Sequence, residues 1–207
     1  ADVAPADPHP PDPYFGAKAL YRDAQLLQIA RQVGADDVAD ELAARVTAEL
    51  EKWTEPQGCA TRDAFCFFYD TRNFGIVGDT PSFGSEEFND HHFHYGYFLY
   101  AAGVLAADDP DLAARLAPVM DLLAADIATS PATEQFVARR NFDSYQSHSW
   151  ASGTSPFADA NNQESASEAV TAYAGLTLWA QASGNKALEV EAHWLHALEG
   201  ASALDYW

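Results

Sequence analysis

Residues 90–107 read DHHFHYGYFLYAAGVLAA, and this stretch decides the class of fold. In a helical conformation its alanine and apolar side chains would occupy much of the circumference, and no proline interrupts the run. We therefore predict an α-helix here. Similar segments lie before and after it, so the architecture depends on how many such helices the chain contains.

Further helices are predicted on both sides by apolar residues at spacings of three and four. They cover residues 17–33, 35–53, 112–128, 165–182 and 186 to the end. Clear breakers separate neighbouring helices, such as EPQG at residues 55–58 and SGN at residues 183–185. Helix pairs that alternate with short breaks indicate a helical array or toroid, although no strict tetratricopeptide or ankyrin repeat is visible.

A different pattern at residues 65–78 predicts a short β-hairpin inserted among the helices. β-Prone aromatic and branched residues stand on both sides of the polar run DTRN at residues 70–73, which suits a turn. The predicted fold class is therefore all-α with a small β-hairpin insertion.

We expect one helical domain with an irregular lead-in. Residues 1–16 contain five prolines, which exclude helix and sheet alike. Residues 17–207 form the predicted helical domain. Apolar periodicity still runs through the last residues, SALDYW, so we expect the domain to be incomplete and the chain to be a fragment of a longer protein.

The net charge excludes several classes of partner. With 31 acidic and 11 basic residues the chain carries −20, which repels nucleic acid and anionic membrane surfaces. No run of about 18 apolar residues is present, so we expect no membrane span. An acidic, solvated exterior suits an extracellular setting, and we expect a secreted monomer.

Aromatic residues are abundant, with 12 Phe, 9 Tyr and 5 Trp. Most must belong to the core, because large aromatic side chains supply much of the buried area of a domain. Aromatic faces also stack on the apolar C–H faces of sugar rings. The composition is therefore compatible with a neutral polysaccharide substrate.

The two cysteines, Cys59 and Cys66, are too few for a disulfide framework, and no CxxC pattern suggests a zinc site. A local disulfide, formed outside the cell, and two free thiols both fit this spacing.

Residues 129–164 form a long stretch without helical period, dense in polar and aromatic residues. A loop of that length inside a helical protein is uncommon unless it is functional. We therefore expect part of a site within this loop.

The first candidate constellation is NDHHFHYGY at residues 89–97. Three histidines within four residues raise a metal interpretation with His91, His92 and His94 as ligands. No HExxH pattern accompanies them, and we expect no metal. In the structural alternative the histidines bond to the backbone and Asp90 is a helix N-cap. Asp90 could begin a helix and still face a cleft.

The second constellation is NNQESASE at residues 161–168. A helix starting here places Glu164 and Glu168, at i and i+4, on one face. In a partly buried cleft this proximity raises one carboxyl pKa, which suits acid–base chemistry. In the alternative, both carboxylates merely offset the dipole of a solvated helix start.

Glycoside hydrolysis needs two carboxyl groups that flank the scissile bond, and Asp90 with Glu164 or Glu168 would supply such a pair. One group donates a proton to the leaving oxygen, and the other attacks carbon or activates water. A separation of roughly 5 Å leads to retention of configuration, and roughly 6.5–9.5 Å leads to inversion.

Three ordered motifs resemble glycoside hydrolase family 81, the endo-β-1,3-glucanases or laminarinases. The motifs are NDHHFHYGYF at 89–98, then RNFD at 140–143 with HSWASG at 148–153, and finally FAD at 157–159 with NQES at 162–165 and SE at 167–168. The likeness extends from about residue 65 to the C-terminus.

The resemblance implies an (α/α)6 toroid that hydrolyses β-1,3-glucan of the laminarin or curdlan type internally, with inversion and without a cofactor. It implies Asp90 as general acid and Glu164 as general base, with Glu168 orienting Glu164 or the substrate. The same likeness places further residues along a sugar-binding groove: His94, Tyr97, His148, Trp150, Asp159 and Asn162.

The chain also departs from the family pattern. Family members are longer and carry a β-rich domain ahead of the helical one, and six helices are about half of a complete toroid. Ala166 and Thr154 stand where we expect serine and a bulky apolar residue. The alternative function is therefore a non-catalytic, glucan-binding fragment of such an enzyme.

Overall fold

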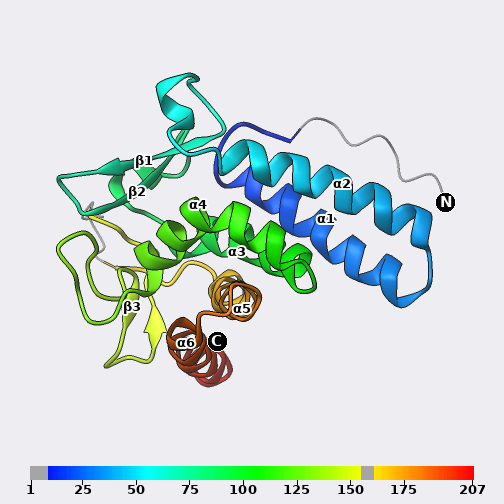
Figure 1. Ribbon diagram of the computed structural model, residues 1–207. Helices are drawn as coiled ribbons and strands as arrows, with labels where there is room; N and C mark the ends of the chain where they lie inside the picture. The colour runs from blue at the N-terminus through cyan, green and yellow to red at the C-terminus, as the bar shows by residue number, and fades with distance from the viewer. Residues whose placement is uncertain (1–8, 155–160) are drawn as a thin grey trace.

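The computed structural model describes residues 9–154 and 161–207 (Figure 1). Its six α-helices are α1 (Phe15–Gln32), α2 (Asp36–Trp53), α3 (His91–Ala106), α4 (Pro110–Ala128), α5 (Ala166–Ala182) and α6 (Lys186–Tyr206). Each predicted helix is confirmed within two residues at either end, and so is the all-α class. Closure into a toroid stays a prediction. None of these described helices is long and apolar enough to cross a membrane.

Helix α1 begins inside the proline-rich lead-in, two residues earlier than predicted. The side chain of Asp12 explains this start, because its Oδ1 accepts from the backbone N–H of Tyr14 at 3.0 Å and of Phe15 at 2.8 Å. Amides at a helix start otherwise lack partners. The irregular segment therefore ends before Phe15.

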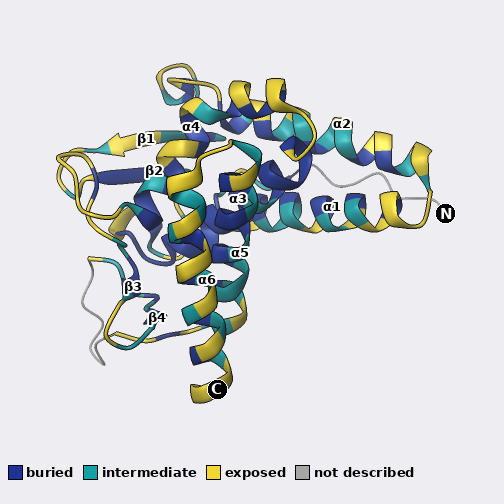
Figure 2. Ribbon diagram, turned by 60° about the horizontal axis from the view of Figure 1, so that its bottom comes forward, coloured by how far each residue is buried: buried dark blue, intermediate teal, exposed yellow. Residues whose placement is uncertain are grey.

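Helix α3 forms the centre of the fold. Every residue of α3 except Tyr100 is buried, and Figure 2 shows the helix in the interior. A helix that is apolar on all sides must be covered on all sides, and α1, α4 and α5 pack against it. Glycines bring α3 and α5 close together, because a β-carbon at Gly96 would overlap the Cα atom of Ala172.

The helices pair as antiparallel hairpins, α1 with α2 and α5 with α6. In Figure 1 the first pair runs across the view, whereas the second is seen nearly end-on, so the two pairs cross steeply. The β-strands and the long loop gather at one end of the helices. This arrangement leaves the loops free to surround a site at that end.

The predicted β-hairpin is present. Strands β1 (Cys66–Asp70) and β2 (Gly75–Asp79) pair antiparallel, with Cys66 opposite Asp79. The turn forms as expected, because Asp70 Oδ1 accepts from the backbone N–H of Arg72 at 2.6 Å and of Asn73 at 3.3 Å.

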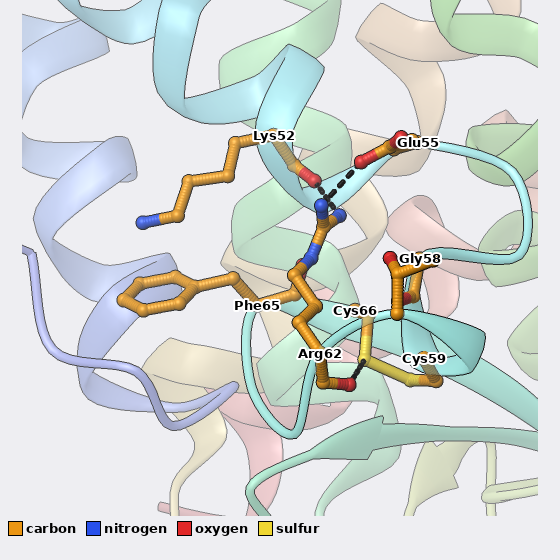
Figure 3. Close-up of a disulfide and its surroundings, with 8 residues drawn as sticks. Lys52, Glu55, Gly58, Cys59, Arg62, Phe65 and Cys66 are labelled. Atoms are coloured by element: carbon orange, nitrogen blue, oxygen red, sulfur yellow. Dashed lines mark hydrogen bonds and ion pairs between the residues drawn. A yellow bond between two sulfur atoms is a disulfide. The ribbon is translucent and has the colours of Figure 1, made fainter.

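A disulfide joins Cys59 to Cys66, which selects one of the two alternatives that the spacing allowed. Figure 3 shows the Arg62 side chain beside it, where its guanidinium donates to the Glu55 carboxylate and the Lys52 carbonyl oxygen. The disulfide therefore ties the loop after α2 to β1. The hydrogen bond from Arg62 to Lys52 ties the same loop to the end of α2.

The long loop between α4 and α5 contains no helix in its described part, as predicted, but it does form a short strand pair. Strands β3 (Phe142–Asp143) and β4 (His148–Ser149) are antiparallel. Buried Asp126 of α4 anchors the loop, because it accepts from Arg140 Nε at 3.2 Å and shares a hydrogen bond of 2.7 Å with His91 Nδ1. A buried carboxylate needs such partners, and here they tie the loop to α3 and α4.

Candidate active site

A small pocket lies where the N-terminal ends of α1, α3 and α5 meet. It is lined by Tyr14, Phe83, Asp90, Phe93, Glu164 and Glu168. Its volume of about 70 Å³ has room for several water molecules. Helix N-termini carry partial positive charge, so three of them together favour carboxylates at this place.

Three residues of the pocket have left-handed backbone conformations, with φ of 52° at Phe83, 56° at Asp90 and 45° at Glu164. Non-glycine residues rarely adopt this conformation, which costs on the order of 1–3 kcal/mol. Strained residues cluster at functional sites, where the surrounding structure holds them in place. The strain at both candidate catalytic carboxyl groups therefore supports a functional role for the pocket.

Asp90 is 6% exposed, and although it precedes α3, its side chain makes no cap hydrogen bond to that helix. Its backbone N–H donates to the Ala151 carbonyl oxygen at 2.9 Å. Burial, followed by the charges of Glu164 and Glu168 and a hydrogen bond with Glu164, raises the pKa of Asp90 to about 7. Asp90 therefore keeps its proton below that pH, as a proton donor must.

Glu164 is exposed, on the last residues of the long loop. Its segment is connected to Asp90 through Ala151, whose N–H donates to the Asn162 carbonyl oxygen at 2.7 Å while its own carbonyl oxygen accepts from Asp90. One alanine thus links the backbone of the candidate acid to that of Asn162, two residues before the candidate base.

Glu168, in the first turn of α5, accepts three hydrogen bonds at one oxygen. The donors are the hydroxyls of Tyr97 (2.7 Å) and Tyr14 (2.8 Å) and the Nζ of Lys18 (3.1 Å). Burial acts to raise the pKa of Glu168, but these bonds outweigh it and lower the pKa below its ordinary value. Neighbouring carboxyl groups whose pKa values are driven apart in this way are typical of acid–base sites.

Comparison with known proteins identifies the family of the chain. The profile of the glycosyl hydrolase family 81 C-terminal domain matches residues 6–207. The chain belongs to glycoside hydrolase family 81. The resemblance inferred from the sequence motifs is therefore confirmed.

Several relatives of this family 81 chain are named glucan endo-1,3-beta-D-glucosidase. The protein from Acetivibrio thermocellus is 41% identical over 201 residues, the one from Thermobifida fusca 36% over 201, and the one from Glycine max 34% over 205. These alignments cover 95%, 95% and 94% of this chain but only 26%, 26% and 30% of the relatives. The chain thus spans less than a third of their length.

A solved structure gives the same assignment. A glycoside hydrolase family 81 protein from Clostridium thermocellum superposes with a TM-score of 0.87 at 40% sequence identity. The superposition covers 95% of this chain and 28% of that protein. The mostly helical fold described above is therefore that of part of a family 81 enzyme.

The first histidine of the family 81 motif has a structural role. His91 Nδ1 forms a hydrogen bond with Asp126 at 2.7 Å, and Nε2 donates to the Ser85 carbonyl oxygen at 2.8 Å. Both ring nitrogens are therefore occupied. The alternative that the histidines bond to the backbone holds for this residue, and the metal interpretation loses one of its three ligands.

His92 and His94 are fully buried, and neither ring has a hydrogen-bond partner among the described residues. Burial lowers the pKa of His92 to about 3 and that of His94 well below its ordinary value, so both rings are neutral. Within the described chain, the one cluster of three potential metal ligands is Cys59, Cys66 and Asp79, whose cysteines are joined in the disulfide.

Two residues predicted to line the sugar groove lie beneath the pocket. His94 is 0% and Tyr97 is 3% exposed, so neither side chain reaches the surface of the described chain. The Tyr97 hydroxyl donates a hydrogen bond to Glu168, which lines the pocket. Their direct contact with sugar stays a prediction.

Three further groove residues, His148, Trp150 and Asn162, are not among the residues that line the small pocket. His148 is buried against Trp150, with ring centroids 4.5 Å apart, and Trp150 donates to Asp143 at 3.2 Å. Asn162 is exposed, two residues before Glu164 in the same loop. The last predicted groove residue, Asp159, lies outside the described residues.

The sequence patterns did not indicate Tyr14, Lys18 or Phe83, although all three belong to the pocket or to its immediate support. Tyr14 stands in a proline-rich run and Lys18 at the start of an ordinary amphipathic helix. The available signals were weak. Tyr14 belongs to an aromatic pair after a run of prolines, and Lys18 is one of the few basic residues in an acidic chain.

Proposed function

We propose that this chain is the catalytic part of an enzyme that cleaves β-1,3-glucan, such as laminarin or curdlan, at internal linkages with inversion of configuration. Asp90 is the general acid and Glu164 the general base. The observation that carries the proposal is one pocket that holds a buried carboxyl group with a pKa of about 7 and an exposed carboxyl group from a separate segment.

Hydrolysis with inversion needs two proton transfers on opposite faces of the sugar. Asp90 donates its proton to the glycosidic oxygen while the bond from that oxygen to the anomeric carbon breaks. Glu164 takes a proton from the water whose oxygen forms the new bond to the same carbon. The raised pKa of Asp90 keeps the donor protonated up to about neutral pH.

The two carboxyl groups must leave space for the sugar and the attacking water. Asp90 and Glu164 line the same small pocket, and inverting hydrolases hold their two carboxyl groups roughly 6.5–9.5 Å apart. Glu164 is the exposed member of the pair, so its side chain can rotate toward solvent. We propose that the sugar and the attacking water enter between the two groups.

The rim of the pocket supports a neutral sugar substrate. Phe83 is 55% exposed and Phe15 is 51% exposed, and their ring centroids lie 5.7 Å apart. Exposed aromatic faces offer stacking surfaces for the C–H faces of pyranose rings. The names of the relatives support a glucan with 1,3-β linkages as the polymer.

The proposed setting is extracellular, with the chain acting as a monomer and without nucleic acid, membrane or cofactor as partner. The Cys59–Cys66 disulfide supports an oxidising compartment. The net charge of −20 opposes binding to nucleic acid and to anionic membranes.

Hydrolysis of laminarin tests the proposal, with the anomer of the new reducing end followed by NMR during the first turnovers. Inversion of a β-linkage produces the α-anomer first. We expect Glu164→Gln to abolish turnover and azide to restore part of it without a covalent glycosyl–enzyme intermediate. Initial β-anomer, or a trapped covalent intermediate, would contradict inversion.

Binding measured beside turnover separates the alternative function. Affinity for laminarihexaose with no product after long incubation would mean that the chain is a glucan-binding fragment. Activity that strong chelators abolish would instead support the metal interpretation of the histidines.

A further inference from the structure

Three donors meet at one oxygen of Glu168, and two of them come from the start of α1, with Tyr14 directly before the helix and Lys18 in its first turn. The Oε1 atom accepts from Tyr97 and Tyr14 hydroxyls and from Lys18 Nζ, at 2.7, 2.8 and 3.1 Å. Lys18 Nζ also donates to the Tyr14 oxygen at 2.8 Å, which turns the Tyr14 hydroxyl hydrogen toward Glu168. Glu168 also lines the pocket together with Asp90 and Glu164, so these bonds hold a carboxyl group of the proposed site.

We propose that Tyr14 and Lys18 are positioning residues that hold Glu168 in one orientation, as an anion, at the edge of the catalytic pocket. This inference rests on the proposed function, because glucan hydrolysis in the pocket is what gives that orientation a purpose. Neither residue belongs to the three motifs that carry the family resemblance.

Tyr14 is itself held firmly, as a positioning role requires. Its ring packs on Phe83 with centroids 4.9 Å apart and on His94 at 5.2 Å. Asp12 accepts from the Tyr14 backbone N–H and also from Ser82 Oγ at 3.1 Å. The segment before α1 is thus attached to the loop that carries Phe83.

A second attachment fixes the same segment further back. His9 Nε2 lies 3.1 Å from an Asp23 carboxylate oxygen, and the fully buried Asp23 also pairs with Arg45 at 2.8 Å and with Arg22 at 3.1 Å. The lead-in is therefore fastened to α1 and α2 before it reaches Tyr14. Moving Tyr14 would require breaking contacts at both attachments.

The charges around Glu168 agree with a fixed anion. Its titratable neighbours are Tyr14 before α1, Lys18 from α1, His92 and Tyr97 from α3, Asp90 before α3 and Glu164 before α5. Lys18 is the cation of this set, and its bonds to Tyr14 and Glu168 outweigh burial and raise its pKa. The charge of Glu168 in turn helps to raise the pKa of Asp90. We call Tyr14 and Lys18, the two residues that hold Glu168, the clamp. Through the charge of Glu168 the clamp helps to raise the pKa of Asp90 without contacting Asp90.

Two variants test the clamp in the 207-residue chain. Tyr14→Phe removes one donor, and Lys18→Met removes the cation from a side chain that is 43% exposed, so this variant should fold. We expect kcat on laminarin to fall about ten- to a hundredfold with little change in KM. The midpoint of the Glu168 carboxyl titration, followed by carbon-13 NMR, should rise in both variants. Lys18→Arg should recover part of kcat.

Tyr100→Phe is the matched control, since it removes a hydroxyl that donates to Gln28 Oε1 at 2.9 Å, away from the pocket. Neither kcat nor the Glu168 midpoint should change. An unchanged midpoint and unchanged kcat in Tyr14→Phe and Lys18→Met would overturn the clamp. A wild type inactive on laminarin, with the midpoint shifts intact, would overturn the proposed function while supporting the hold on Glu168.

Discussion

At the scale of single residues, Asp90 combines two unfavourable features. Its backbone is left-handed, with φ of 56°, and its carboxyl group is buried with Oδ1 lacking a partner among the described residues. Both features reduce stability. A residue that is retained although its backbone conformation and the burial of its side chain are both unfavourable is expected to have a functional role.

Replacing Asp90 should therefore separate activity from stability. Asp90→Asn removes the proton donor and should abolish turnover. The folded-state pKa of about 7 lies above the unfolded value of about 3.9, so the Asp90 contribution to stability is present at low pH and lost as pH rises through 7. Asparagine does not ionise. The variant should exceed the wild type in free energy of unfolding by on the order of 2–4 kcal/mol at about pH 8.

Urea unfolding at about pH 4 and pH 8 measures this difference, which should vanish at the lower value. Asp108→Asn, at an exposed position after α3, should change the free energy of unfolding by less than about 0.5 kcal/mol at both values. Equal free energies of unfolding for Asp90→Asn and wild type at the higher pH would show that ionisation of the buried Asp90 carboxyl group does not destabilise the fold.

A second residue-scale prediction concerns Phe83, the exposed aromatic residue of the pocket. In the inactive Glu164→Gln background, Phe83→Ala should raise the Kd for laminarihexaose about three- to tenfold, because one stacking surface is lost. Isothermal titration calorimetry measures the change. Phe68→Ala, which removes a similarly exposed ring from β1, should leave the Kd unaltered. Equal affinities for the two variants would remove Phe83 from the sugar site.

At the scale of elements, the contact between α3 and α5 depends on the absence of side chains. Gly96 faces Ala172, and Gly103 faces Leu178 so closely that a β-carbon would lie 2.6 Å from its carbonyl carbon. The two helices carry Asp90 and Glu168 at their N-terminal ends. Their close packing therefore sets the width of the pocket.

The same substitution should thus have opposite effects on two helices. Gly96→Ala gains about 1 kcal/mol of helix propensity, but the overlap with Ala172 should lower the net free energy of unfolding by about 1–3 kcal/mol. Gly200→Ala in α6 meets no atom within 4 Å and should raise it by about 0.5–1 kcal/mol. Denaturant unfolding of both variants measures these changes in the free energy of unfolding. An increase for Gly96→Ala would disprove the tight contact between α3 and α5.

At the scale of the whole molecule, the net charge of −20 opposes compaction. Salt shortens the range of this repulsion, with a Debye length of about 10 Å at 0.1 M and about 3 Å at 1 M. We expect Tm to rise by a few degrees between these concentrations of sodium chloride, as measured by calorimetry. A fall in Tm would mean that attractive surface ion pairs such as Arg115–Glu51, whose side chains are 54% and 47% exposed, outweigh the repulsion.

Much of the fold could be predicted because its signals are local. The helices follow from apolar residues at helical spacing, and the hairpin from the DTRN turn between β-prone runs, so each boundary depends on residues within a few positions. The first helix began earlier than predicted because the Asp12 cap replaces the missing amide partners. The spacing of Cys59 and Cys66 left two states open until the backbone between them was known.

The site could be predicted only in part. Asp90, Glu164 and Glu168 were indicated by the motifs, and the structure places them in one pocket. Tyr14 was not indicated, because its hydroxyl bonds to a residue 154 positions away. No periodicity or spacing reports such a contact.

The amino-acid sequence by itself determined the helices, the hairpin, the acidic character and the family. These depend on backbone preferences and on charge, which each short segment carries with it. Only the tertiary structure decided which carboxyl group keeps its proton. Protonation depends on the water excluded and on the charges and donors that packing brings near, and here those come from α1, α3 and the long loop together.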